Sequence, residues 1–199
     1  IFIVAGWYHM IPSSWMKVAP AFGLHASLLP DYSGGAPLVW AIINGEKKTG
    51  ITLFQMKKGV DNGPVIGQLA TKISTEDTIA TLYERIDALG LELLREHLPQ
   101  IVNGSAKRIV QNEKHRRIFP QRSPEDGEID WTQSSEQISR AIRAFHPWPG
   151  TFTKFGGKRL KILEAGINDK GPGNLDSGEV HCKDIVKVGY IKRSGILSG

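Results

Sequence analysis

The sequence predicts an α/β protein with a mainly parallel sheet, followed by a small β-rich region. Two observations lead to this prediction. Through residues 1–98, short β-branched or aromatic segments alternate with segments whose apolar residues recur every three or four positions. From Thr151 onward, the pattern changes to short strand-like segments separated by turns, one of them rich in glycine.

The first predicted elements are a strand, a short helix and a second strand. Residues 1–7 (IFIVAGW) form an apolar run ending near Gly6, which is typical of a buried parallel strand. Because the chain begins on this run without a Met, we expect a fragment whose upstream strands are missing. Pro12 and the serines after it predict a helix start, with the helix reaching Val18. Residues 22–25 predict the next strand.

The middle of the chain predicts a short helix, a strand and a long helix. Residues 38–44 are apolar enough for a buried helix, and Gly45 follows them. Residues 50–56 alternate as a strand does, with a short continuation at 65–68. Residues 76–98 predict the long helix, and Pro99 marks its expected end. One apolar stripe defines it: Ile79, Leu82, Ile86, Leu89 and Leu93.

A change of composition predicts a boundary between two domains. We expect a catalytic domain at residues 1–105, a basic linker at 106–124 and a β-rich domain at 125–199. Within the linker the basic residues are Lys107, Arg108, Lys114, Arg116, Arg117 and Arg122. This run and the net charge of +5 fit either a solvated linker or a surface that attracts phosphates. Ser134 and Gln137 then predict a capped helix.

Composition excludes several classes of protein. No apolar run approaches the roughly 20 residues that cross a bilayer, so we expect no membrane partner. Cys182 is the only cysteine in the 199 residues, which excludes an intrachain disulfide framework and favours a reducing cytoplasm. Its neighbour His181 brings no further residues at metal-ligand spacing, so no metal site is expected.

Two polar residues follow predicted strands and could act together. His25 ends one strand, and Asp61 lies in a Gly-flanked turn after another. Neighbouring parallel strands present such residues at the same edge of a sheet, where a His and a carboxylate form a general acid/base pair. The alternative is a solvated loop histidine. A hydrolase triad with Ser27 is rejected, because a serine two residues from its own base has poor geometry and no nucleophile elbow is present.

These residues carry a resemblance to a known family. Residues 25–30 (HASLLP), followed by Gly34 and Pro37, resemble the first signature of the folate-dependent formyltransferases, and residues 59–64 (GVDNGP) resemble the second at the family's spacing. Residues 124–150 contain two further stretches, PEDGEIDW and RAFHPWPG, that resemble the start of the C-terminal domain of the tRNA and amino-sugar members. The resemblance covers nearly the whole chain and weakens after about Ala165.

The resemblance implies a Rossmann-like catalytic domain, incomplete at its N-terminus, and an OB-like C-terminal domain. It implies transfer of a formyl group from 10-formyltetrahydrofolate to a primary amine, without a metal. His25 is then expected to donate to the oxyanion, and Asp61 to hold the imidazole and move protons. The implied folate pocket is formed by five residues: Tyr8, His9, Met10, Ile11 and Val60.

The resemblance leaves the acceptor open. The basic linker and second domain favour methionyl-tRNA, whereas Trp40 and residues 116–127 (RRIFPQRSPEDG) resemble the branch acting on nucleotide-linked amino sugars. Gly23 stands where the family carries an Asn whose amide points toward the formyl oxygen. Losing such a donor typically costs about 10²–10³ in rate, so we expect Ser27 to replace it. If nothing replaces it, a non-catalytic relative that binds folate or nucleic acid is the third reading. Oligomeric state stays open.

Overall fold

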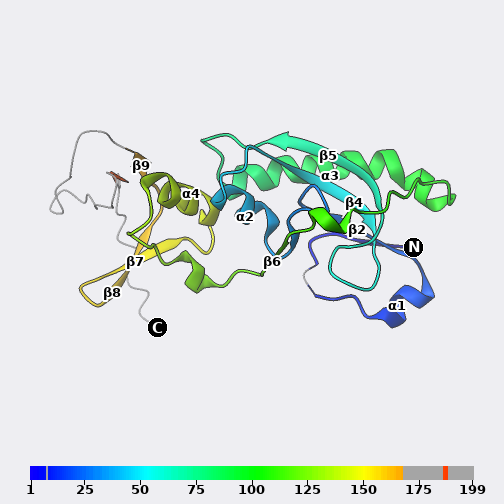
Figure 1. The fold of residues 1–199 in the computed structure, drawn as a ribbon, viewed down its shortest axis with the longest axis horizontal. Helices are drawn as coiled ribbons and strands as arrows, with labels where there is room; N and C mark the ends of the chain where they lie inside the picture. The colour runs from blue at the N-terminus through cyan, green and yellow to red at the C-terminus, as the bar shows by residue number, and fades with distance from the viewer. Residues whose placement is uncertain (8, 168–185, 188–199) are drawn as a thin grey trace. The chain divides into compact units, whose positions relative to one another are not determined.

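The fold is described from a computed structural model, which describes residues 1–7, 9–167 and 186–187 (Figure 1). The chain divides into two compact units. Unit 1 holds residues 1–41, 46–75 and 81–121, and unit 2 holds residues 42–45, 76–80 and 122–199. No helix among the described residues combines the length and apolar character needed to cross a membrane.

Unit 1 is built on a four-stranded sheet. Its strands lie in the order β1 (Phe2–Val4), β2 (Ala21–His25), β4 (Lys48–Gln55), β5 (Val65–Lys72). The α/β class is as predicted, but of the pairings in this sheet only β1–β2 is parallel, whereas β2–β4 and β4–β5 are antiparallel. The short connection from β4 to β5 explains part of this difference, because parallel neighbours need a crossover of a dozen or more residues. β4 is buried along six consecutive residues, as a central strand should be.

The predicted helices of the first half are all present. α1 covers Ser13–Val18, α2 covers Pro37–Ile43, and α3 covers Ile79–Val102. Pro99 lies inside α3, so the prediction that it ends the helix was wrong. A proline inside a helix lacks an N–H and its ring crowds the carbonyl four residues before it. The helix nevertheless continues beyond Pro99, where the N–H of Asn103 donates to the Pro99 carbonyl at 3.1 Å.

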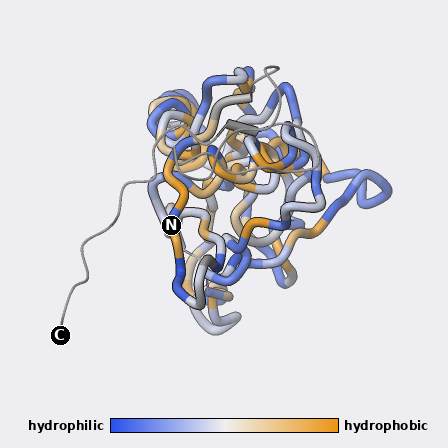
Figure 2. The backbone as a smooth tube through the Cα atoms, turned by 90° about the vertical axis from the view of Figure 1, so that its left-hand side faces the viewer, coloured by the Kyte–Doolittle hydropathy of each residue, from blue (hydrophilic) through white to orange (hydrophobic). Residues whose placement is uncertain are grey.

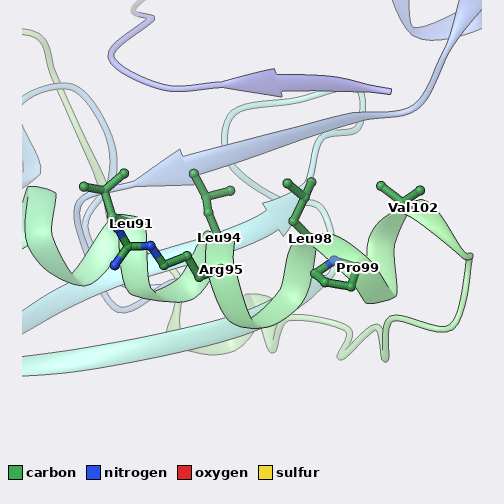
Figure 3. Close-up of a pocket in the computed structure, with 6 residues that line it drawn as sticks. All are labelled: Leu91, Leu94, Arg95, Leu98, Pro99 and Val102. Carbon is green, nitrogen blue, oxygen red and sulfur yellow. The ribbon is translucent and has the colours of Figure 1, made fainter.

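α3 has two different apolar faces. The predicted stripe is buried at Leu82, Ile86 and Leu93. A second row lies along another side of the helix and lines a shallow apolar groove (Figure 3). Its apolar members are Leu91, Leu94, Leu98, Pro99 and Val102. The N-terminal strand, which Figure 2 colours as hydrophobic, is also exposed along residues 1–3. None of the candidate site residues lines this groove.

The second half of unit 1 contains a strand pair that the sequence did not predict. β3 (Ser33–Gly34) pairs in parallel with β6 (Ile118–Phe119). Upstream of β6, Ile109 forms an antiparallel bridge with Val65 at the start of β5, and a short 3-10 helix spans Glu113–His115. Residues 106–121 of the expected linker 106–124 belong to unit 1, and several of them make backbone hydrogen bonds to other parts of that unit.

Unit 2 contains a capped helix and short strands. A 3-10 turn at Pro124–Gly127 precedes α4 (Ser135–Phe145), and the predicted capping box of Ser134 and Gln137 is formed in both directions. The strands pair antiparallel in two sheets: β7 (Thr151–Phe155) with β8 (Lys158–Ile162), and β9 (Gly166–Ile167) with β10 (Val186–Lys187). One cluster of the core of unit 2 consists of four buried isoleucines: Ile129, Ile138, Ile142 and Ile162. The described part of the C-terminal region contains these short strands, and much of the expected OB-like domain lies outside the described residues.

Candidate active site

The structure brings His25 and Asp61 together. His25 is the last residue of β2, and Asp61 lies in the turn between β4 and β5. The Nδ1 atom of His25 is 3.6 Å from Oδ2 of Asp61, and the two side chains are 11% and 20% exposed. The pair is therefore mostly shielded from water but open to a ligand.

Hydrogen bonds orient both members of the pair. Nε2 of His25 lies 2.8 Å from the carbonyl oxygen of Tyr32. Because a carbonyl only accepts, Nε2 carries the proton in this arrangement, and Nδ1 is the nitrogen that faces the carboxylate. The N–H of Gly34 donates to Oδ2 of Asp61 at 2.8 Å. The loop after β2, residues 26–36, thus contacts both side chains.

A buried network holds the start of that loop. The hydroxyl of Thr52, which is fully buried on β4, donates to the Ser27 carbonyl at 2.6 Å and accepts from the N–H of Leu29 at 3.1 Å. The amide of Gln68 donates to the same hydroxyl and to the Leu29 carbonyl, both at 2.8 Å. A network whose buried polar groups all have hydrogen-bond partners is rigid, because breaking one bond leaves several of these groups without a partner.

Ser27 differs from its expected role. Its side chain is 1% exposed, and its hydroxyl donates to the Asp31 carbonyl at 2.7 Å. The hydroxyl proton is therefore committed within the loop. In this structure Ser27 therefore holds the shape of the loop.

Gly23 lies where the neighbouring strand leaves little room for a side chain. Gly23 lies directly opposite Phe54 in the β2–β4 pair. A Cβ atom built on Gly23 would lie 2.8 Å from Cε1 of Phe54 and 3.4 Å from Cγ of Met56. The buried Phe54 ring thus occupies the space that a larger residue at position 23 would need.

Gln111 supports the other arm of the site. It is buried, and its Nε2 donates to the carbonyls of Asp61 and Gly63 at 2.7 and 2.6 Å. These bonds hold the turn on which Asp61 adopts a positive φ of 47°. Among the described residues, the other two non-glycine positions of positive φ are Tyr32 and Ala36, both in the His25 loop. All three belong to one site, where such conformations often reflect function.

An arginine adds charge at the outer side of the His25 loop. The guanidinium of Arg117 donates to both carboxylate oxygens of Asp31 at 2.6 Å and to Glu46 at 3.2 Å. The hydrogen bond with Asp31, followed by that with Glu46, raises the pKa of Arg117, so it stays charged. The hydroxyl of Tyr32 also donates to Glu46 at 2.7 Å.

Of the five residues expected to bind folate, four lie in the described part of the chain. Tyr8 lies outside the described residues. Met10 and Val60 are 62% and 38% exposed, and Ile11 is partly exposed. The ring of His9 is exposed and contacts that of Trp7, with centroids 5.8 Å apart. These are apolar and aromatic surfaces available to a flat ligand.

Sequence reasoning missed the supporting residues of this site. Thr52, Gln68 and Gln111 are polar residues in strands or in the expected linker, and only their burial and contacts mark them. The described part of the chain holds no group of three potential metal ligands. His181 and Cys182 lie outside the described residues.

Comparison with protein families matches both halves of the chain. A family model described as formyl transferase matches residues 1–98, and one described as the formyl transferase C-terminal domain matches residues 122–193. The methionyl-tRNA formyltransferase of Lactococcus lactis is 38% identical over 179 residues, which are 89% of this chain and 56% of that protein. The chain thus spans a little over half the length of this relative.

Solved structures share the fold. The crystal structure of an N-formyltransferase from Helicobacter canadensis, in complex with folinic acid and dTDP-3-aminofucose, has a TM-score of 0.65 and 26% identity, and the match covers 76% of this chain and 56% of that one. HypX from Aquifex aeolicus, in complex with tetrahydrofolic acid, has a TM-score of 0.74 at 24% identity, with coverage of 86% and 30%. Both halves of the chain and its fold lead to one conclusion: this chain belongs to the formyl transferase family.

Proposed function

We propose that this protein transfers a formyl group from 10-formyltetrahydrofolate to a primary amine, with His25 and Asp61 as the catalytic pair. The single observation that carries the proposal is the approach of the two side chains, 3.6 Å apart and partly open, within a chain of this family. The folate supplies an activated one-carbon group that the amine attacks.

His25 would stabilise the negative charge that forms on the formyl oxygen. Its Nε2 holds a proton and now donates to the Tyr32 carbonyl, so the same N–H would turn from that carbonyl to the substrate oxygen. A donor aimed at the developing charge, in a site that is mostly shielded from water, contributes more than the same donor in water.

Asp61 would stabilise the imidazolium and accept protons from the attacking amine. Oδ2 receives the N–H of Gly34 and faces the imidazole, whereas Oδ1 makes neither contact. The negative charge thus lies beside the ring nitrogen that needs it, and one oxygen stays available for a proton on its way to the leaving folate nitrogen, directly or through water.

The donor would bind beside this pair on the exposed apolar residues. Met10, Ile11 and Val60 supply the apolar surface, and Tyr8 and His9 belong to the same proposal. Ser27 is left out of the catalytic group because its hydroxyl is committed to Asp31. The cytoplasmic location inferred from the cysteine count stays a prediction.

For the acceptor we propose methionyl-tRNA. The Lactococcus relative carries that activity in its name, and the relative from Marinobacter nauticus, also 38% identical, carries the same name. The basic residues of segment 106–121 fit a phosphate-rich partner, because clustered Lys and Arg release counterions on binding nucleic acid.

A nucleotide-linked amino sugar is the second candidate. The Helicobacter structure holds such a sugar nucleotide. In addition, the two features that resemble this branch contact each other: the indole N–H of Trp40 donates to the Pro120 carbonyl at 2.9 Å, and its ring stacks on Phe119 at 6.0 Å.

The test is formyl transfer by the full-length protein, with 10-formyltetrahydrofolate as donor and methionyl-tRNA or dTDP-linked amino sugars offered separately. We expect turnover with methionyl-tRNA, and a fall of about 10²–10⁴-fold in kcat for His25→Ala and Asp61→Ala. His115→Ala, which changes an exposed histidine in a 3-10 turn, is the matched control and should retain activity.

Each outcome decides between the candidates. Turnover only with a sugar nucleotide would replace the tRNA proposal by the second candidate. Folate binding without turnover on any acceptor would overturn the enzyme proposal, and would mean that Gly23 has removed an essential donor.

A further inference from the structure

We propose that residues 117–120, named here the Arg117 clamp, position the catalytic pair by holding the far side of the His25 loop. The inference rests on the proposed function, because it concerns the same two side chains. From sequence, this segment was expected to be a linker. The proposal gives it a part in setting the geometry of the site.

The clamp and the pair bind opposite edges of β3. The N–H groups of Ser33 and Gly35 donate to the carbonyls of Arg117 and Phe119, both at 2.9 Å. The residues between and beside them face the other way: the Tyr32 carbonyl accepts from His25, and the N–H of Gly34 donates to Asp61. Along a strand, successive backbone groups point to alternate edges. A displacement of β3 from the clamp therefore moves the partners of His25 and Asp61.

Two glycines permit this close contact. A Cβ on Gly34 would lie only 2.3 Å from the Phe119 carbonyl oxygen, and one on Gly35 would lie 2.4 Å from Cα of Gln121. Gly34 also has a φ of 92°, which L side chains rarely adopt. The Gly-Gly pair in the loop is thus explained by the nearby backbone of Phe119, in the clamp, and of Gln121, directly after it.

Side chains fix the clamp in register. The ring of Tyr32 stacks on Phe119 with centroids 4.5 Å apart and planes within 5°. Cζ of Arg117 lies 4.8 Å from the centroid of the Tyr32 ring, and the guanidinium donates two hydrogen bonds to the carboxylate of Asp31. Arg117 is 52% exposed, so its ion pairs add little to global stability. Their bidentate geometry nevertheless fixes an orientation that a lysine could not provide.

The test compares Arg117→Ala and Arg117→Lys with Arg108→Ala in the full-length protein. Arg108 is the matched control, since it lies in the same segment, 106–121, and also bonds to another part of unit 1. It donates to the side chain of Gln55 at 2.8 Å, and this bond does not involve β3. Two readouts are taken: kcat and KM of formyl transfer, and the ring ¹H–¹⁵N NMR signals of His25, which need no substrate.

We expect both Arg117 variants to lower kcat about 10-fold or more, because misplacing reacting groups by about 1 Å can cost 10²-fold. The KM for the donor should change little, and the His25 ring signals should shift, whereas Arg108→Ala should leave kcat and these signals as they are. Unshifted His25 signals in Arg117→Ala would overturn the inference, as would equal losses in Arg117→Ala and Arg108→Ala. If the wild type has no activity on any acceptor, the proposed function fails, while the NMR comparison still decides on the clamp.

Discussion

The two arms of the site, the His25 loop and the Asp61 turn, are held in different ways. The His25 loop is bound from two sides, by the buried hydroxyl of Thr52 and by the backbone of the Arg117 clamp. The Asp61 turn is held chiefly by one buried side chain, Gln111, together with the N–H of Gly34. The comparison teaches that the position of Asp61 depends on the His25 loop as well as on its own turn.

The largest effect should come from breaking the inner support of the His25 loop. Thr52→Val keeps the shape of the side chain but leaves the Ser27 carbonyl and the N–H of Leu29 without this hydrogen-bond partner. We therefore expect a loss of about 2–3 kcal/mol in the free energy of unfolding in urea. Thr52→Ser retains the hydroxyl and should lose about 1 kcal/mol or less. Equal urea midpoints for Thr52→Val and the wild type would show that the network is not a support.

A second change acts where the strands leading to the two arms meet. Gly23→Asn would push against the buried Phe54 ring, and we expect a cost of about 1–3 kcal/mol in the free energy of unfolding. Combining it with Phe54→Leu should cost less than the sum of the single changes, because the smaller side chain makes room. Strict additivity in this double-mutant cycle, measured by urea unfolding, would contradict the steric account.

The smallest effect should come from the Asp61 turn. Gln111→Leu removes both donors to the turn, and we expect a loss of about 1–2 kcal/mol in the free energy of unfolding, with a fall in formyl transfer. Gln100→Leu, at an exposed position of α3, is the control and should stay within about 0.5 kcal/mol. If Gln111→Leu costs more than Thr52→Val, the ranking of the two arms is wrong.

Much of this architecture is predictable from sequence, because it depends on local pattern. The apolar stripe of α3 and the Ser134 capping box follow from spacing alone. The proximity of His25 and Asp61 agrees with the prediction, but the reason given for it was wrong. β2 and β4 are antiparallel, so their carboxyl ends lie at opposite edges of the sheet, and it is the connection from β4 to β5 that brings Asp61 to His25. Pairing direction is set by connections and tertiary context, which periodicity does not record.

Contacts between distant segments were not predictable. Residues 117–121 lack any period, because they bind unit 1 mainly through backbone hydrogen bonds and not through an apolar stripe. The hydroxyl of Ser27 looked available from sequence, since nothing local shows that it is 1% exposed and donates to Asp31. The role of Gln111 could not be predicted from sequence, because a buried glutamine is identified only by the carbonyls to which its amide donates.

The extent of unit 1 bears on how catalytic domains of this kind should be cut and recombined. The matched N-terminal family model ends at residue 98, whereas unit 1 continues to Gln121. A chimera joined at the end of the match would take His25 and Asp61, the proposed catalytic pair, from one parent and the residues proposed to position them from the other. For an exchange of C-terminal domains we therefore expect a junction after Gln121 to work better, because the clamp and the His25 loop then come from the same parent.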